Sequence, residues 1–469
     1  MRSTRERELK LDVDGSFELP TLEGEELPTR QFTSTYHDTP ARSLMRAGIT
    51  LRRRLENGKS VWQLKLPRSD AARSEIEEPG GPARVPKGLG GLLAAHLRHG
   101  PLEPVATLRT RRSGVRVLDG ERRVADVTVD RVDVLDAGRS AGGFVEVEVE
   151  LVDGDEADLE RLGRRLLRAG ARASDGVPKL HRVLAPPAGD EPVGASLRDQ
   201  LRHLLSAQLA ELEAHDPGVR LGEDAEDVHR FRVATRRTRA LLRATKPLLG
   251  EALVPLGEEL RWLGGVLGSV RDLDVLLDHL RREVATLDTD QRAGRELLSG
   301  LEAARDEARG QLLEALGSPR YRALLDAFAT AIAAVPSLPK GADADSLAGQ
   351  AFHRLRRASE RLPAEPSDEQ LHRLRIKAKR ARYAAELAAL GGAASAKRAV
   401  DALKQVQDVI GEHQDAVVAE ERLRALARAR TAVAAGRLIE RERARRSARR
   451  EAYPEAVAVA LRAGRKAFG

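Results

Sequence analysis

The sequence predicts an α+β domain built on an antiparallel β-sheet or barrel, followed by an all-α domain of two related helical bundles. Three observations predict this fold class. The chain has 469 residues, which is too long for a single hydrophobic core. Its first 184 residues mostly alternate apolar and polar side chains, whereas the residues from Ser196 onward follow the helical period of 3.6. The helical part also repeats itself at a fixed interval.

Six segments of the first part have the alternation of strands and are separated by glycine-containing breaks. They are residues 6–13, 49–55, 61–66, 105–118, 124–134 and 144–152. Helices are expected at 155–169 and 89–99. The stretch that follows is rich in proline and glycine, as is typical of a linker. The predicted domains are therefore 1–187 and 196–469, joined by a linker at 188–195.

The second part is rich in Ala, Leu, Arg and Glu, with breaks expected near Asp216, Pro247, Pro336 and Pro363. Two of its motifs recur 143 residues later. The first is His229-x-x-Arg232-x-x-x-Arg236-Arg237-x-Arg239, which returns as His372-x-x-Arg375-x-x-x-Lys379-Arg380-x-Arg382. The second is Leu267-Gly268-x-x-Arg271-Asp272, which returns as Ile410-Gly411-x-x-Gln414-Asp415. One offset for two motifs indicates two related bundles, each offering an equivalent face.

The composition excludes several classes of protein and site. There is no cysteine, so any metal must be held by oxygen or imidazole, and a reducing compartment is expected. The N-terminus lacks the apolar region of a secretory signal, and no apolar stretch is long enough to span a bilayer. We therefore expect a cytoplasmic protein without membrane contact.

The net charge of +8 is concentrated in the helical part, which has 48 Lys and Arg against 41 Asp and Glu, compared with 32 against 31 up to residue 190. A basic surface of this kind attracts polyanions of any type.

The strands carry carboxylates and cations on one face. In a strand, alternate residues share a face, so Glu6, Glu8 and Lys10 point one way and Leu9 and Leu11 the other. The same alternation places further charges together: Arg52 with Arg54, Asp126 with Asp130, and Glu146 with Glu148 and Glu150. Such a face is either solvated, as in many antiparallel sheets, or lines a charged barrel interior. Five or six strands with this pattern favour the interior, where clustered carboxylates would need a hard cation such as Mg²⁺ or Mn²⁺.

The charged strands resemble a known family in an ordered series of motifs. Glu6-x-Glu8-x-Lys10 is similar to the ExExK signature of the CYTH family, the triphosphate tunnel metalloenzymes. The matching segments that follow are 36–40, 46–54, 62–67, Arg109 and Arg112, the run ending at Asp130, Glu146-x-Glu148-x-Glu150, and Lys179. Pro178 stands where the family usually has the serine of a Ser-Lys pair. The resemblance implies an eight-stranded antiparallel tunnel.

The resemblance also implies roles for individual residues. One or two divalent cations would be held by Glu6, Glu8, Asp130, Glu146, Glu148 and Glu150. Phosphates would be bound by Lys10, Arg52, Arg54, Lys65, Arg109, Arg112 and Lys179. Arg109 and either Arg111 or Arg112 are alternatives, because a bulge changes which of them faces inward. Glu6, Glu8 and Lys10 would be the catalytic set. The implied chemistry is attack by a positioned water on a terminal phosphorus.

The first motif of the repeat forms a basic stripe in each copy. On a helix, the spacing of His229, Arg232, Arg236 and Arg239 places them along one side, and the second copy repeats the stripe with His372, Arg375, Lys379 and Arg382. One such helix is commonly a solvated charged face, and its histidine a structural hydrogen-bond partner. Two copies with few acidic partners favour a linear polyanion. The stripes resemble the CHAD domain, a helical domain associated with inorganic polyphosphate, which implies phosphate contacts for these residues and for Arg237 and Arg380.

Two functions follow from these features. The first is a metal-dependent hydrolase of inorganic triphosphate or short polyphosphate, with polyphosphate bound by the helical domain. The alternative is a non-enzymatic polyphosphate-binding protein. The low aromatic content, 3%, leaves few platforms for stacking bases and argues against nucleic acid. The oligomeric state cannot be inferred from the sequence.

Overall fold

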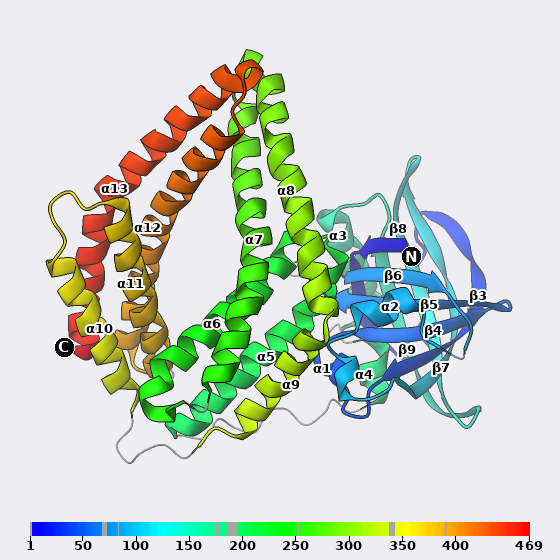
Figure 1. The fold of residues 1–469 in the computed structure, drawn as a ribbon. Helices are drawn as coiled ribbons and strands as arrows, with labels where there is room; N and C mark the ends of the chain where they lie inside the picture. Colours follow the sequence, from blue (N-terminus) through cyan, green and yellow to red (C-terminus); the bar gives the residue numbers. More distant parts are fainter. Residues whose placement is uncertain are drawn as a thin grey trace. The chain divides into compact units, whose positions relative to one another are not determined.

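The chain folds into two compact units, drawn in Figure 1. The computed structural model describes residues 2–67, 73–82, 84–174, 178–184, 196–251, 253–336, 343–389 and 392–469. One unit comprises Met1–Asp190 with Asp216–Leu221, and the other comprises Glu191–His215 with Gly222–Gly469. The expected linker at 188–195 lies outside the described residues.

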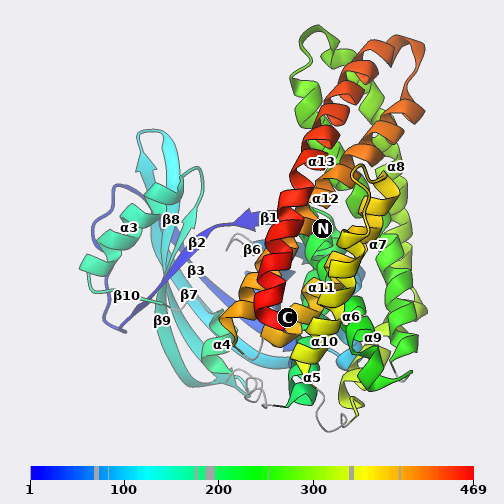
Figure 2. The same ribbon diagram turned by 90° about the vertical axis from the view of Figure 1, so that its left-hand side faces the viewer.

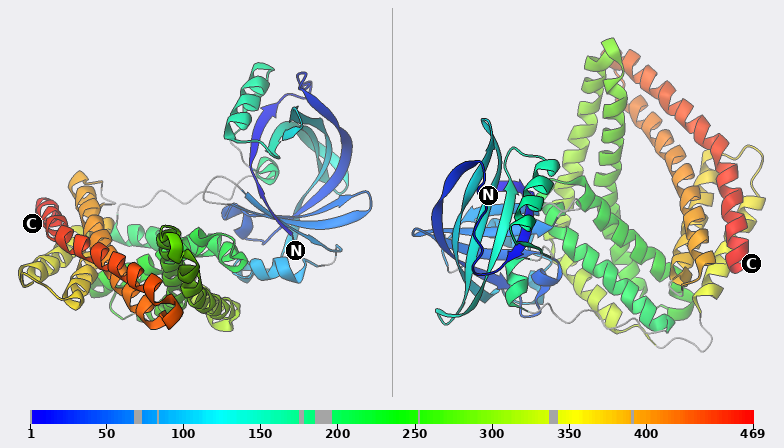
Figure 3. Two further views of the ribbon diagram at one scale, coloured as in Figure 1. Left: turned by 90° about the horizontal axis from the view of Figure 1, so that it is seen from above. Right: turned by 180° about the vertical axis from the view of Figure 1, so that it is seen from behind.

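The first unit contains one antiparallel sheet, which has ten strands within the described residues. They are β1 (Arg2–Glu6), β2 (Glu8–Val13), β3 (Gly24–Asp38), β4 (Thr50–Glu56), β5 (Lys59–Pro67), β6 (Arg73–Pro79), β7 (Glu103–Asp119), β8 (Arg122–Asp136), β9 (Arg139–Leu151) and β10 (Arg172–Ala173). Their order is β1-β6-β5-β4-β3-β7-β8-β9-β2-β10. β1 is at one end of this order and only Arg7 separates it from β2, the last strand but one, so the sheet closes into a tunnel (Figure 3). The predicted antiparallel barrel is confirmed, with ten described strands where the resemblance implied eight.

The main differences from the sequence prediction are at β1 and β2, at β3, and at β6, which was not predicted. The expected strand 6–13 is divided at Arg7, because β1 pairs with β6 and β2 pairs with β9. Strand β3 was not predicted. Its register shifts between Leu27 and Arg30, and only its second half alternates buried with partly buried side chains. A bulge of this kind inserts extra residues and hides the period of two.

The apolar side of the sheet packs against a helix. Leu11, Val127 and Val147 are buried with Leu162 and Leu166, which come from α3 (Glu156–Arg168). Figure 2 shows α3 beside these strands. Because alternate residues point to opposite faces, covering the apolar face leaves the charged face for the interior of the tunnel. Three short helices complete the unit: α1 (Ser43–Arg46), α2 (Lys87–Leu92) and α4 (Lys179–Val183).

The second unit is helical, as predicted. Its helices are α5 (Leu197–Leu221), α6 (Ala225–Leu249), α7 (Val254–Ala285), α8 (Gln291–Gly317), α9 (Pro319–Ala333), α10 (Ala344–Glu360), α11 (Asp368–Ala389), α12 (Ala394–Leu426) and α13 (Ala432–Phe468). The expected break near Asp216 is wrong, because α5 continues through Pro217, as α6 does through Pro247. Among the described residues, no helix is long and apolar enough to cross a membrane.

One apolar cluster joins the two halves of the helical unit. It combines Leu280 of α7 and Leu301 of α8 with Leu423 of α12 and Leu438 of α13. These helices form two long antiparallel pairs in Figure 1. The cluster therefore fixes the first repeat against the second.

We expect Leu280→Ala to destabilise the helical unit by about 2–5 kcal/mol, because Leu280 is fully buried in this cluster and its truncation leaves a cavity. Chemical unfolding followed by far-UV circular dichroism measures the loss. Val433→Ala is the control, since Val433 is 66% exposed and should change the unfolding free energy little. Equal stability of the two variants would contradict the assigned core.

Candidate functional site

The tunnel encloses a cavity of about 330 Å³ lined almost entirely by polar and charged side chains. Most of the residues predicted for a metal and phosphate site line it: Glu8, Lys10, Arg52, Arg54, Lys65, Arg112, Asp130, Glu148, Glu150 and Lys179. Direct cross-strand pairing explains this proximity. Lys10 is opposite Glu148 and Glu8 opposite Glu150, while Arg112 is opposite Asp130.

Three carboxylates on one wall form a buried acidic cluster. Asp130 of β8 and Glu146 and Glu148 of β9 each place an oxygen within 4.8 Å of the others. The ammonium of Lys179 lies among them, with Nζ 3.0 Å from Asp130 Oδ2 and 2.7 Å from Glu148 Oε1, and it also pairs with Glu146. Buried like charges repel strongly unless a cation joins them. Lys179 is that cation here.

Further cations hold the acidic cluster in place. Arg112 donates two hydrogen bonds to Asp130, from Nε at 2.7 Å and from Nη2 at 2.6 Å, and it also contacts Glu148. Lys10 Nζ lies 3.1 Å from Glu148 Oε1 and 3.4 Å from Glu8 Oε1. The fork of an arginine fits a carboxylate in two places and so fixes its orientation.

The surroundings lower the pKa of two carboxylates of this wall and raise the pKa of two others. Burial disfavours the charge of Glu148, but Lys179, Lys10 and Arg112 outweigh it and hold its pKa well below the ordinary value. Burial is likewise outweighed at Asp130 by Lys179 and Arg112, which lower its pKa. Burial raises the pKa of Glu146 and of Glu150. The wall therefore carries two firmly ionised carboxylates and two that take up a proton more readily.

The cations on β4 and β5 lie across the tunnel from β9. Arg52 donates to Gln63 Oε1 at 2.7 Å and to the Tyr36 hydroxyl at 3.3 Å. Lys65 Nζ lies 3.0 Å from Glu75 Oε2. Arg54 has fewer counter-charges; burial and the adjacent Arg52 lower its pKa to about 10. Its guanidinium stacks 3.5 Å from the centre of the Phe32 ring. An anion in the cavity would relieve this repulsion.

The acidic cluster fits a divalent cation of the hard type. Its donors are carboxylate oxygens, which Mg²⁺ and Mn²⁺ prefer, and Glu146 is completely buried with only Lys179 and Arg182 as ion-pair partners in the described residues. The neighbouring Glu8 and Glu150 line the cavity and could complete a ligand set.

Three residues predicted for the tunnel site do not line the described cavity. Glu146 is fully buried and pairs with Lys179. Glu6 ends β1 opposite Arg73, and its side chain lies outside what the structure describes. Arg109 and Arg111 are exposed and do not line the cavity, whereas Arg112 does. The reason is the alternation of β7, in which Leu108, Thr110 and Arg112 share the inward side.

The cavity also contains charged residues that the sequence analysis missed, namely Arg30, Glu75 and Glu77. They lie on β3 and β6, neither of which was predicted. Glu75 and Glu77 alternate with Ser74 and the buried Ile76. The same alternation that identified Glu146 and Glu148 could have found them.

The helical unit contains a second charged cavity, of about 440 Å³. Its lining includes His229, Arg232 and Arg236 from α6, Arg271, Asp272 and His279 from α7, Arg375 and Lys379 from α11, Gln414 and Asp415 from α12, and Arg445 from α13. The repeat predicted two separate basic faces. The structure instead brings residues of both stripes together in one pocket.

The pocket is pseudo-symmetric. Five pairs of lining residues are related by the repeat interval of 143: Arg232 with Arg375, Arg236 with Lys379, Arg271 with Gln414, Asp272 with Asp415, and Val275 with Val418. Each repeated glycine lies beside the arginine of its own repeat. A Cβ at Gly268 would lie 3.5 Å from Arg232 Nη1, and one at Gly411 would lie 3.1 Å from Arg375 Nη2. At Gly411 this distance is tight, so the glycine leaves room for Arg375, whereas the distance at Gly268 is an ordinary van der Waals contact.

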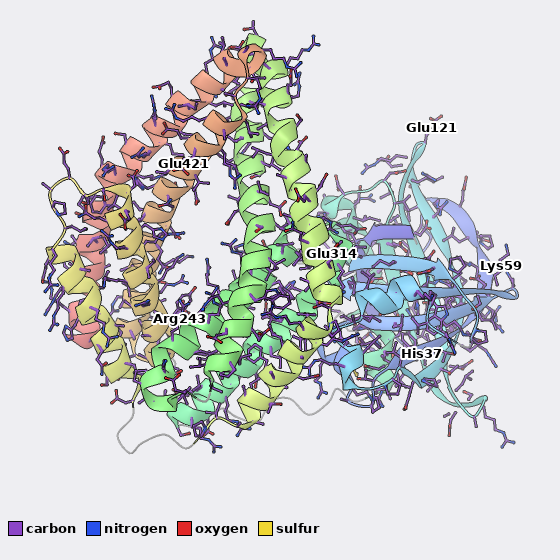
Figure 4. The ribbon with its side chains drawn as sticks, viewed as in Figure 1. His37, Lys59, Glu121, Arg243, Glu314 and Glu421 are labelled. Atoms are coloured by element: carbon purple, nitrogen blue, oxygen red, sulfur yellow. The ribbon has the colours of Figure 1, made fainter. Side chains whose placement is uncertain are left out.

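The remaining stripe residues lie elsewhere on the same helices. Arg237 and Arg382 both approach Glu386, at 4.0 and 3.4 Å, and Arg382 stacks on Tyr383. Arg239 lines a smaller cavity with Arg243, the residue labelled in Figure 4. The pKa of Arg243 is lowered mainly by burial and further by the nearby charge of Arg380. His372 is exposed and does not line the pocket, unlike its counterpart His229.

Comparison with known proteins finds the same two domains. The model of the CYTH domain matches residues 4–174, and that of the CHAD domain matches residues 203–424. Two uncharacterized proteins of Mycobacterium tuberculosis, from strains CDC 1551 / Oshkosh and H37Rv, are each 34% identical over 459 residues, covering 89% of this chain and 88% of theirs.

Solved structures also resemble parts of the chain. The CHAD domain from the plant Ricinus communis is 26% identical, with a TM-score of 0.48, over 58% of this chain and 95% of its own. PptA from Streptomyces chartreusis is 27% identical, with a TM-score of 0.46, over 55% of this chain and 98% of its own.

We expect Lys179→Met to destabilise the tunnel by about 3–5 kcal/mol in metal-free buffer at neutral pH, because it leaves three buried carboxylates without their shared cation. Lowering the pH should reduce this loss, since protonation removes the repulsion. Added Mg²⁺ should stabilise the variant more than the wild type.

Thermal unfolding with and without Mg²⁺ tests this expectation. The matched control is Lys59→Met, because Lys59 is exposed at the start of β5. If Lys179→Met unfolds at the same temperature as the wild type without metal, the charge balance described above is wrong.

Proposed function

The chain belongs to the proteins that join a CYTH domain to a CHAD domain, and on this premise we propose that it hydrolyses inorganic triphosphate or short polyphosphate with a divalent cation and binds polyphosphate through its helical domain. One observation carries the proposal. The tunnel cavity has a carboxylate cluster on β8 and β9 and faces it with the cations of β4 and β5. This combination suits a metal-bound phosphate chain.

In this proposal, the carboxylates of the tunnel bind the metal and its lysines and arginines bind the phosphates. Mg²⁺ or Mn²⁺ would be held by Asp130, Glu146 and Glu148, with Glu6 and Glu8. The remaining predicted ligand, Glu150, would instead accept a proton. Lys10, Arg52, Arg54 and Lys65 bind the phosphate oxygens, together with Arg112 and Lys179 at the border between the walls. Arg109 is no longer included in this set, because it is exposed outside the cavity. The metal, when bound, would neutralise phosphate charge as a Lewis acid.

The reaction requires a water in line with a terminal phosphorus. The arginines and lysines align the phosphate chain and balance the charge that develops on its oxygens. Glu150 lines the cavity, and burial raises its pKa, which suits a carboxylate that accepts the proton of the attacking water. The new bond joins the water oxygen to phosphorus, the bridging P–O bond breaks, and the shortened phosphate leaves with the electron pair.

The proposed role of the helical domain is to retain longer polymer. The pocket shared by the repeats has cations on α6 and α11, and the Nε atoms of Arg236 and Arg375 are buried without a hydrogen-bond partner in the described residues. Buried cations without partners are costly, so a polyanion would be bound strongly there. The further stripe residues Arg237, Arg239, Arg380, Arg382 and His372 would contact a chain that extends beyond the pocket.

We expect Glu148→Gln to reduce metal-dependent phosphate release from inorganic triphosphate by about 100-fold or more, because it removes a charge that the proposed metal site and Lys179 share. Colorimetric phosphate release with Mg²⁺ or Mn²⁺ measures the effect. The control is Glu160→Gln on α3, whose side chain is 64% exposed. Polyphosphate binding without turnover in the wild type would instead support the non-enzymatic alternative.

We expect Arg236→Ala to weaken polyphosphate binding about tenfold, the equivalent of about 1.4 kcal/mol, because it removes a buried cation of the shared pocket. Arg230→Ala is the matched control on the same helix. Arg230 is exposed and paired with Glu226, so its loss changes the net charge equally without touching the pocket. Equal losses in a titration at fixed salt would mean that general charge, and not the pocket, binds the polymer.

A further inference from the structure

Lys379 is the one lysine among the residues that line the pocket shared by the two repeats. Its neighbours on its own helix, α11, are Arg375 and Arg382, and α6 adds Arg232 and Arg236. Within the described part of the chain, no carboxylate forms an ion pair with it. The ammonium of Lys379 therefore lies in a partly buried cluster of guanidinium groups.

The other charged groups of the pocket do not cancel this repulsion. From α6 and α7 come His229, Arg271, Asp272 and His279, from α12 Asp415, and from α13 Arg445. Asp272 is engaged by Arg232 Nη1 at 2.7 Å. Asp415 is largely buried, which raises its pKa, and its nearest counter-charge is Arg375. The lining thus contains two carboxylates but five arginines and one lysine, so its positive groups outnumber its negative ones.

Among the lysine and the arginines of this pocket, only Lys379 can lower the charge by losing a proton. Arginine stays protonated in proteins, whereas lysine loses its proton when burial and like charges disfavour the ammonium. Burial, followed by Arg375, Arg236 and Arg232, lowers the pKa of Lys379 to about 7. In the free protein at neutral pH, a substantial fraction of Lys379 is therefore a neutral amine.

We propose that the pocket binds its polyanion together with one proton, which is taken up by Lys379. The inference rests on the proposed binding of polyphosphate to this pocket. Phosphate oxygens beside Lys379 supply the negative charge that the cluster lacks, and the Nζ amine gains a proton from solvent to become an ammonium that donates to them. The affinity for the polymer then depends on pH through the protonation of Lys379.

The direction of the linkage follows from the two states. The bound anion raises the pKa of Lys379 above its value in the free protein, so the complex holds more protons than the separated partners above neutral pH. Affinity is therefore greatest at and below pH 7 and falls as the pH rises. With a free-state pKa of about 7, the apparent dissociation constant should increase roughly 20-fold between about pH 7.5 and 9.

The repeat supplies the variant for the test. The residue equivalent to Lys379 in the first repeat is Arg236, which lines the same pocket. Lys379→Arg makes the two halves alike and replaces the titrating group with a permanent cation. The variant should bind at least as tightly as the wild type at pH 9, and its dissociation constant should change only a few-fold between about pH 7.5 and 9.

The experiment is isothermal titration calorimetry of the full chain with long-chain inorganic polyphosphate at fixed salt. Pairs of buffers with different ionisation enthalpies give the number of protons taken up per binding event. Near pH 8.5 this number should approach one for the wild type and should fall by nearly one for Lys379→Arg. Lys377→Arg, on the same helix but not lining the pocket, is the matched control and should retain the wild-type uptake.

Each outcome decides a separate point. If the wild type binds polyphosphate but Lys379→Arg keeps the same pH dependence, the proton belongs to another group and the inference is wrong, while the proposed function stands. If the wild type does not bind polyphosphate at pH 7.5, the proposed function fails and the inference with it. Lys379→Met gives a second test that does not depend on the arginine: it should bind more weakly than the wild type near neutral pH and lose the pH dependence.

Discussion

The contact of Lys179 with three buried carboxylates is the interaction on which the tunnel depends. Removing a charge from water costs several kcal/mol unless a partner replaces the lost hydration. Asp130, Glu146 and Glu148 share one ammonium, and Arg112 adds a guanidinium. These contacts allow the tunnel to fold with a charged interior. The pocket in the helical unit has the opposite balance, because its cations exceed its carboxylates.

Much of the fold could be predicted because the relevant strands are regular. In β2 and β9, polar and apolar residues alternate without interruption, and the register then places Lys10 opposite Glu148. Strand β3 escaped prediction because the shift after Leu27 interrupts its period. On the helical side, the spacing of Arg232 and Arg236 identified a common face, but a helical period does not say which faces of distant helices will meet. The shared pocket therefore had to come from the structure.

The facing side of a site residue could be predicted from the sequence only where the residue lies in a regular strand or helix. Arg112 and Arg109 could not be separated by sequence, since both lie in a long strand where one bulge reverses the facing side. Lys179 could be judged only in three dimensions. Pro178, which departs from the family pattern, has φ −53° and immediately precedes α4, so proline is compatible with the start of this helix and Lys179 becomes its first residue.

The shared pocket has a consequence for how such a domain can be assembled. Each repeat supplies one half of the lining, with Arg232, Arg236 and Asp272 from the first and Arg375, Lys379 and Asp415 from the second. A chain that contained a single repeat would have only half a site, and it could complete the pocket only by pairing with a second copy about a two-fold axis. Fusing the two copies in one chain removes the need for that encounter. It also frees each half to mutate alone, which a symmetric dimer cannot do, and the exchange of Arg271 for Gln414 between the halves is one such divergence.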